Sequence, residues 1–374
     1  MRRLVALDLP GGRQFVDELQ RAWDAGDAVL PLDQRFNEST KLDLVRQLRA
    51  SVVIEATGTS TIEAGSPVED GDALVMATSG TTGIAKGVVL THDALRASAH
   101  ATSDALRVSD DDHWLACLPL SHVGGLSVVV RSLVTRTPLT VHDGFDAAAV
   151  TSAAHSGCTL VSLVPTTLPR IDTSLFRTIL LGGSRPPASR PANVIATYGL
   201  TETGSGIVYD GRPIPGVEIS IGDDDEILVR GPMLMREYRD GSTTIDTDGW
   251  LHTGDAGTFD NGILSVTGRL DDLIKTGGEK VWPDVVEKAL TGLVDPSCIC
   301  VVGVEDPEWG ERVVIVTSME LDLAEVKAMV RAALPPYCAP KDIVRVDELP
   351  TTAIGKIRRK ECARIATRVL ARPT

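Results

Sequence analysis

The sequence lacks three features that would place it in other classes of protein. Its six cysteines, at positions 117, 158, 298, 300, 338 and 362, include no C-x-x-C pair, and no His/Cys cluster has zinc spacing. No apolar run approaches the roughly twenty residues that a membrane-spanning helix needs. Positive charge is in deficit, and the formal net charge of −14 argues against a nucleic-acid-binding protein.

These absences predict a cytoplasmic protein with no membrane insertion and no nucleic-acid partner. The scattered cysteines fit a reducing compartment. Two arginines stand near the start, but Asp8 and Pro10 interrupt the apolar run too early for a signal peptide. At 374 residues, 43% of them hydrophobic, the chain is long enough for two domains. The oligomeric state stays open, with a homodimer as one option.

Residues 78–87 are the most informative stretch, with four hydroxyl side chains, three glycines and one lysine. Glycine lets backbone N–H groups turn inward, hydroxyls donate to phosphate oxygens, and Lys86 adds a positive charge. The composition fits a phosphate-binding loop or a surface turn between strands. A Walker A loop is excluded, because Ala85 precedes the lysine, Gly87 follows it, and residues 88–90 resemble a second strand.

Hydrophobic periodicity predicts an alternation of helices and strands. Helices are expected over residues 14–25, 39–50, 283–290 and 323–334, and from about residue 91. Strands are expected over residues 52–55, 159–164, 178–181, 298–304 and 313–318.

Several other polar stretches are ambiguous by themselves. A lone histidine such as His122, before two glycines, is more often structural than functional. Arg131, inside the apolar residues 126–134, fits either a surface arginine or a charge held at a pocket for an anionic substrate. Residues 198–204 alone resemble a loop with a glutamate whose carboxylate has ordinary hydrogen-bond partners. Residues 355–360 alone resemble a basic surface tail.

Together these stretches resemble the adenylate-forming enzymes: acyl-CoA synthetases, peptide-synthetase adenylation domains and luciferases. Five motifs follow in the family's order from residue 78 to residue 357, and alanine replaces the usual proline at position 85. The resemblance implies an α/β and α+β fold. A large mixed-sheet N-terminal adenylation domain would span residues 1–270 and a smaller mobile α+β C-terminal domain residues 271–374, with a hinge near Asp271.

The resemblance also implies which residues bind ATP and catalyse the first step. Tyr198 would stack on adenine, Asp255 would accept hydrogen bonds from the ribose, and Arg269 would contact ribose or phosphate. The full predicted ATP-binding set is Thr78, Ser79, Gly80, Thr81, Thr82, Gly83, Lys86, Tyr198, Asp255 and Arg269. The predicted catalytic residues are Lys356, Thr201 and Glu202, and Glu202 is also the predicted Mg²⁺ ligand.

Two more groups of residues follow from the resemblance. The predicted acid-binding residues are His122, Arg131, Gly182, Gly183 and Ser184. The predicted residues for coenzyme A and the second step are Lys275, Gly277 and Gly278.

The implied activity is that of an ATP-dependent acid–thiol ligase that uses ATP, Mg²⁺ and coenzyme A on a small-molecule carboxylate. Three features resemble the compact bacterial o-succinylbenzoate–CoA ligases of menaquinone synthesis: the short N-terminal part before the loop at residues 78–87, the segment that contains His122, and Arg131 after it. That acid has two carboxylates, and Arg131 is predicted to meet the one that is not activated, with Arg170 and Arg185 as alternatives.

Three other functions remain open: another aryl- or fatty-acyl-CoA ligase, an acyl-AMP ligase that uses a carrier-protein thiol, and a protein that has lost catalysis. The presence of Glu202, Asp255, Arg269 and Lys356 disfavours the last of these.

Overall fold

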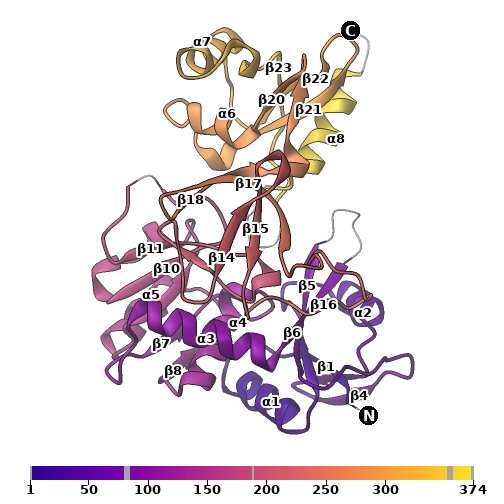
Figure 1. Cartoon of the computed structure of the whole chain (residues 1–374), viewed down its shortest axis with the longest axis vertical. Coiled ribbons are helices and arrows are strands. Elements are labelled where there is room, and N and C mark those ends of the chain that lie inside the picture. The colour runs from indigo at the N-terminus through magenta and orange to yellow at the C-terminus, as the bar shows by residue number, and fades with distance from the viewer. Residues whose placement is uncertain (1, 80–84, 188, 352–356, 372–374) are drawn as a thin grey trace. The chain divides into compact units, whose positions relative to one another are not determined.

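The computed structural model describes residues 2–79, 85–187, 189–351 and 357–371, with only the backbone given for Ser79 and Pro296. The fold is mixed α/β, as predicted (Figure 1). The chain divides into two compact units. Unit 1 comprises Met1–Ser220, Leu228–Thr253 and Asp260–Leu264, and unit 2 comprises Ile221–Ile227, Gly254–Phe259 and Ser265–Thr374. Two moving domains that meet near Asp271 stay a prediction.

The first sheet of unit 1 has the strand order β16-β6-β5-β2-β1-β3-β4. Its strands are β1 Leu4–Asp8, β2 Ala28–Pro31, β3 Val52–Glu55, β4 Gly58–Thr61, β5 Asp72–Ser79, β6 Ala85–Thr91 and β16 Glu237–Tyr238, with helices α1 Arg13–Asp24 and α2 Glu38–Gln47. Strand β1 pairs in parallel with β2 and β3, β2 pairs in parallel with β5, and β5 pairs antiparallel with β6. The predictions for residues 14–25, 39–50 and 52–55 are confirmed, because α1, α2 and β3 lie there.

The second sheet of unit 1 has the order β13-β12-β11-β10-β9-β7-β8. Its strands are β7 Trp114–Ala116, β8 Leu139–Val141, β9 Leu160–Leu163, β10 Thr178–Leu181, β11 Val194–Tyr198, β12 Val208–Tyr209 and β13 Arg212–Pro213, with helices α3 His92–Leu106, α4 Val123–Thr135 and α5 Ala147–His155. Strands β8, β7, β9, β10 and β11 are parallel. The helix expected from about residue 91 is α3, and the Thr91 side chain caps it by accepting from Ala94 N–H at 3.1 Å.

A third sheet has the order β14-β15-β17-β18. Its strands are β14 Glu218–Ile221, β15 Glu226–Arg230, β17 Leu251–Asp260 and β18 Ile263–Arg269. Short 3₁₀ segments lie at η1 Leu168–Arg170, η2 Thr173–Leu175, η3 Thr201–Thr203, η4 Asp223–Asp225, η5 Leu270–Asp272, η6 Pro296–Cys298 and η7 Pro336–Cys338.

The fourth sheet belongs to unit 2 and runs β20-β19-β22-β21, with β23 beside β22. Its elements are β19 Ile274–Thr276, β20 Glu279–Val281, β21 Ile299–Asp306, β22 Gly310–Thr317, β23 Asp342–Arg345, α6 Pro283–Ala289, α7 Leu323–Ala333 and α8 Arg359–Leu370. Alternate residues of β21 face opposite sides. Val301 packs with Val286 of α6 and Val326 of α7, whereas Cys300 packs with Cys362 of α8. Helices therefore cover both faces of this sheet.

Within the ranges that the structure describes, no helix combines the length and the apolar composition needed to cross a bilayer.

Candidate active site

Predicted site residues gather at one edge of the second sheet of unit 1. The chain continues from β7 toward His122, from β10 into residues 182–184, and from β11 through Tyr198 into η3. These three strands are parallel, so their carboxyl ends lie at the same edge, where open α/β sheets bind ligands. The structure thus brings His122, residues 182–184 and Tyr198 to a common edge.

The glycines at this edge are required by the backbone. Gly183 has φ of +85°, which a residue with a side chain rarely adopts. A Cβ at Gly199 would lie 2.3 Å from the carbonyl oxygen of Ser205. Gly183 therefore suits a positive φ and Gly199 a close approach of two backbone segments, and both needs explain why glycine stands there.

The predicted phosphate loop lies at the tip of the β5–β6 hairpin. Thr78 stands opposite Lys86 in the antiparallel register, and its hydroxyl donates to the Lys86 carbonyl at 3.3 Å. Gly80, Thr81, Thr82, Gly83 and the Ser79 side chain lie outside the described residues. The strand–loop–strand order is confirmed, which separates this site from a Walker A loop.

Lys86 and Glu202 both contact the side chain of Tyr238, a residue that the sequence analysis did not identify. Tyr238 of β16 donates its hydroxyl hydrogen to Glu202 Oε1 at 2.9 Å. The Lys86 ammonium lies 4.5 Å from the centre of the Tyr238 ring. Met235 N–H donates to the Glu202 carbonyl at 2.7 Å, which fixes the backbone of the same residue. The predicted phosphate-binding lysine and the predicted metal ligand thus share Tyr238 as a contact.

Glu202 fits a magnesium site of the kind that phosphate substrates complete. Mg²⁺ commonly takes one or two carboxylates from the protein and its other ligands from phosphates and water. Glu202 is half-buried, and the tyrosine that donates to it also contacts the ammonium of Lys86, a setting suited to a phosphate chain. No group of three or more His, Cys, Asp or Glu side chains elsewhere in the described ranges has the arrangement of a metal site.

His122 is joined to two residues of the N-terminal region in which the sequence showed no catalytic motif. Its Nε2 lies 3.4 Å from Asp33 Oδ2 and 3.2 Å from Arg35 Nη2. Arg35 also donates through Nε to Asp33 at 2.8 Å. Burial would raise the pKa of Asp33, but hydrogen bonds from Arg35 and His122 hold it well below its usual value. Asp33 and Arg35 follow β2 without any spacing pattern that could have revealed them.

Arg131 lies inside unit 1, so the alternative of a surface arginine is wrong. Its residue exposure is 2%, Nη2 donates to Ser205 Oγ at 3.1 Å, and the guanidinium carbon lies 4.7 Å from the Trp114 ring centre. Nε and Nη1 have no hydrogen-bond partner in the part of the chain that the structure describes. Burial lowers the pKa of Arg131. A cavity of about 10 Å³, which Ser127 also lines, adjoins it and has room for about one water molecule.

Contact between Arg131 and a substrate carboxylate stays a prediction, and it requires this cavity to widen. Arg170 and Arg185, the two other arginines considered for the second carboxylate, lie in different surroundings. Arg170 lies in η1 with its guanidinium carbon 4.9 Å from the Phe145 ring centre, and Arg185 follows residues 182–184 at the sheet edge.

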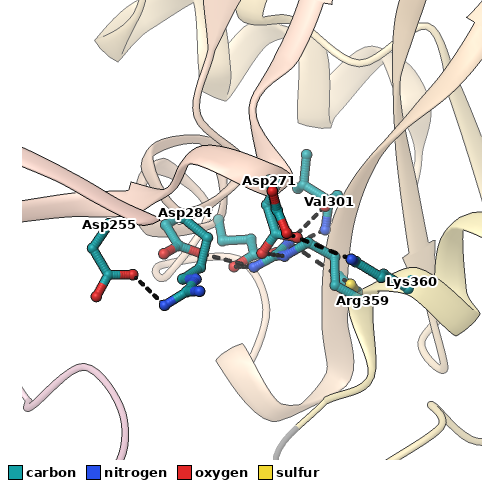
Figure 2. Close-up of polar contacts among 10 residues, drawn as sticks. Asp255, Asp271, Asp284, Val301, Arg359 and Lys360 are labelled. Carbon is teal, nitrogen blue, oxygen red and sulfur yellow. Dashed lines mark hydrogen bonds and ion pairs between the residues drawn. The ribbon is translucent and has the colours of Figure 1, made fainter. Parts of the chain in front are cut away.

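In unit 2, Asp255 and Arg269 form an ion pair. Arg269 Nη1 lies 2.8 Å from Asp255 Oδ1 (Figure 2). Asp255 comes from β17 and is largely buried, whereas Arg269 ends β18 with a half-exposed side chain. The arginine holds the carboxylate in one orientation, as a residue that accepts hydrogen bonds from a ribose would need.

The predicted hinge and second-step residues follow directly along unit 2. Asp271 lies in η5, and its Oδ2 is 3.6 Å from Lys360 Nζ (Figure 2). Lys275 in β19 has an exposed side chain. Gly277 and Gly278 form the β19–β20 turn with φ of +59° and +83°. Their roles with coenzyme A stay predictions.

Lys356 lies outside the described residues, but the chain on both sides of it is fixed. Thr351 pairs with Ile357 in an antiparallel bridge, and Arg358 N–H donates to the Pro350 carbonyl at 2.8 Å. The basic residues that follow are not a free tail, because Arg359 begins α8.

Two family models match the chain. The model for the AMP-binding enzyme matches residues 12–239, and the model for the AMP-binding enzyme C-terminal domain matches residues 285–356. The chain belongs to the family of AMP-binding enzymes.

Individual relatives show which AMP-binding enzymes the chain is similar to. The chain is 35% identical over 324 residues to the 2-succinylbenzoate–CoA ligase of Listeria monocytogenes, covering 77% of this chain and 69% of that protein. It is 35% identical over 336 residues to a probable 2-succinylbenzoate–CoA ligase of Mycobacterium tuberculosis, covering 81% and 87%. The o-succinylbenzoate CoA synthetase of Bacillus subtilis, solved with the acyl-adenylate intermediate, matches with TM-score 0.83 and 28% identity, covering 96% and 88%. The resemblance and the fold class predicted from the sequence are confirmed.

Proposed function

We propose that this protein is an ATP-dependent acid–thiol ligase that converts o-succinylbenzoate into o-succinylbenzoyl-CoA. The contact of both Lys86 and Glu202 with Tyr238 carries the proposal, because a cation and a carboxylate that share one tyrosine would suit a triphosphate and its Mg²⁺. The relatives named as 2-succinylbenzoate–CoA ligases support the choice of acid. The Bacillus subtilis synthetase is also known in complex with ATP and magnesium ion, which supports the same cofactors here.

The reaction has two steps. In the first, an oxygen of the substrate carboxylate bonds to the α-phosphorus of ATP while the bond to pyrophosphate breaks, which gives acyl-AMP. In the second, the sulfur of coenzyme A bonds to the acyl carbon, AMP leaves with the electrons of the broken C–O bond, and the thiol proton passes to water. Negative charge shifts in both steps, so fixed donors and cations should supply most of the acceleration.

Individual residues then take defined parts in the first step. The β5–β6 hairpin and Lys86 bind the phosphates, Glu202 holds Mg²⁺, and Lys356 stabilises the charge between the carboxylate and the α-phosphate. Bound Mg²⁺ supplies positive charge beside the phosphate oxygens. Tyr198 stacks on adenine.

The second step uses the smaller domain. Rotation about Asp271 brings Lys275, Gly277 and Gly278 toward the thiol, while Asp255 and Arg269 of the larger predicted domain hold the ribose. The moving domains would be residues 1–270 and 271–374. A cytoplasmic location and a homodimer also stay predictions.

The proposal is tested by incubating the purified protein with ATP, Mg²⁺ and coenzyme A, and one of three acids: o-succinylbenzoate, benzoate or a medium-chain fatty acid. AMP release with o-succinylbenzoate alone, together with the mass of its thioester, is the expected result. Turnover only with another acid would retain the adenylation chemistry and reject the assignment of the acid. Acyl-AMP without a thioester would point to a different thiol acceptor.

Replacing Arg131 with leucine should raise KM for o-succinylbenzoate on the order of tenfold or more, because a charge-assisted hydrogen bond contributes about 1.5–3 kcal/mol. KM for a monocarboxylate should change much less. Folding should persist, because an apolar residue that replaces a poorly paired buried charge is often tolerated. Steady-state kinetics on both acids checks this.

Arg170→Leu and Arg185→Leu serve as matched variants for Arg131→Leu. Unchanged discrimination in Arg131→Leu would remove Arg131 from the acid pocket, and a loss of discrimination in one of the other two would transfer the role to that arginine.

A further inference from the structure

The side chain of Tyr238 contacts both charged residues predicted to bind the triphosphate and its Mg²⁺. It lies in β16, a two-residue strand that pairs antiparallel with β6, with Tyr238 opposite Val88. Its exposure is only 7%, so its ring is held inside unit 1. The Arg239 N–H donates to the Gly87 carbonyl at 2.6 Å, which binds the same segment to the residue after Lys86.

The hydroxyl of Tyr238 acts on the carboxylate of Glu202. A hydrogen bond of 2.9 Å from a buried donor restricts the carboxylate to one orientation. Partners of this kind, one step removed from a metal, typically change metal affinity 10- to 100-fold when they are lost. Among the described residues, no other donor is seen at the Glu202 carboxylate, because the Met235 N–H donates to the backbone carbonyl of Glu202 instead.

The ring of Tyr238 acts on Lys86. The ammonium lies 4.5 Å from the ring centre, within the range of a cation–π contact. Lysine has a flexible stem and loses much rotamer freedom when it binds. A ring face that already holds the ammonium reduces that loss before ATP arrives.

We propose that Tyr238 is a positioning residue that orients the Glu202 carboxylate toward Mg²⁺ with its hydroxyl and holds Lys86 with its ring. The proposal rests on the proposed function, since it assigns Glu202 and Lys86 to Mg²⁺ and ATP. It divides the tyrosine into two separable parts, and each part has its own variant.

Tyr238→Phe keeps the ring and removes only the hydroxyl, whereas Tyr238→Leu removes both. Two calorimetric titrations of the intact protein with ATP, one in the presence of Mg²⁺ and one in the presence of EDTA, measure binding of Mg·ATP and of free ATP. Neither needs an acid substrate or turnover. For Tyr238→Phe we expect Mg·ATP binding to weaken on the order of tenfold and binding of free ATP to stay at the wild-type value. For Tyr238→Leu we expect both to weaken.

Tyr209→Phe is the matched control. Tyr209 is also buried, at 8% exposure, and its hydroxyl lies 3.0 Å from Thr102 Oγ1, so the variant loses a buried hydroxyl without touching Glu202 or Lys86. Melting temperatures of all variants show whether each one folds. Tyr238→Phe that binds Mg·ATP as tightly as Tyr209→Phe would overturn the inference. A wild-type protein that fails to bind Mg·ATP would overturn the proposed function itself, and failure of o-succinylbenzoate alone would leave the role of Tyr238 intact.

Discussion

Lys356→Ala should lower the rate of adenylation on the order of 10²- to 10³-fold, the usual consequence of losing one donor that stabilises transition-state charge. Thioester formation from supplied acyl-AMP should stay close to the wild-type rate, because the first-step charge has already left with pyrophosphate. Pyrophosphate release measures the first step, and the appearance of the thioester from acyl-AMP and coenzyme A measures the second.

Lys288→Ala provides the control for Lys356→Ala. Lys288 is an exposed lysine of α6 in the same unit, so the variant removes a positive charge without removing a predicted catalytic group. It should leave both steps unchanged. If Lys356→Ala slowed both steps equally, the two-conformation mechanism would be contradicted.

The sequence was sufficient wherever the determining pattern is local. Residues 78–87 separate two apolar runs, so a strand–loop–strand hairpin followed from composition alone, and the structure has β5 and β6 there. Helix α3 was expected from about residue 91 because apolar residues recur there at helical spacing, and the structure begins it at His92 with Thr91 as its cap. These elements depend on neighbours within a few residues.

The sequence was insufficient where a residue's role comes from distant partners. Tyr238 lies in a two-residue strand within a turn-rich segment, and only its pairing with β6 places it between Lys86 and Glu202. Asp33 and Arg35 follow β2, and only the fold brings them to His122. No periodicity in a single chain encodes such contacts.

The interpretation of residues 355–360 as a basic surface tail, one of two that the sequence left open, is wrong at Arg359 for the same reason. Three basic residues in a row resemble a solvated tail, but Arg359 lies among three carboxylates drawn from earlier segments of unit 2 (Figure 2). Its guanidinium nitrogens lie 3.3 Å from Asp272, 2.7 Å from Asp284 and 2.5 Å from Glu287. It also donates to the Val301 carbonyl at 2.6 Å. Burial would lower the pKa of Arg359, but Glu287 and Asp284 raise it above its ordinary value, so the charge is retained.

Arg359→Leu should therefore lower the free energy of unfolding by about 3 to 5 kcal/mol, the usual cost of removing one partner from a buried ion pair. The cost arises because half-buried carboxylates, including Asp272, whose pKa burial already raises, lose their shared cation. Arg359→Lys should recover only part of the stability, since one ammonium cannot replace a planar fork that reaches several acceptors. Urea unfolding followed by circular dichroism measures the change.

Arg364→Leu is the control, because it removes an arginine of α8 with 72% side-chain exposure. It should change the free energy of unfolding by at most about 0.5 kcal/mol. Equal effects of Arg359→Leu and Arg364→Leu would mean that the carboxylates around Arg359 are solvated well enough to do without it, and that α8 is held to unit 2 by its apolar contacts at Cys362 and Ala366 alone.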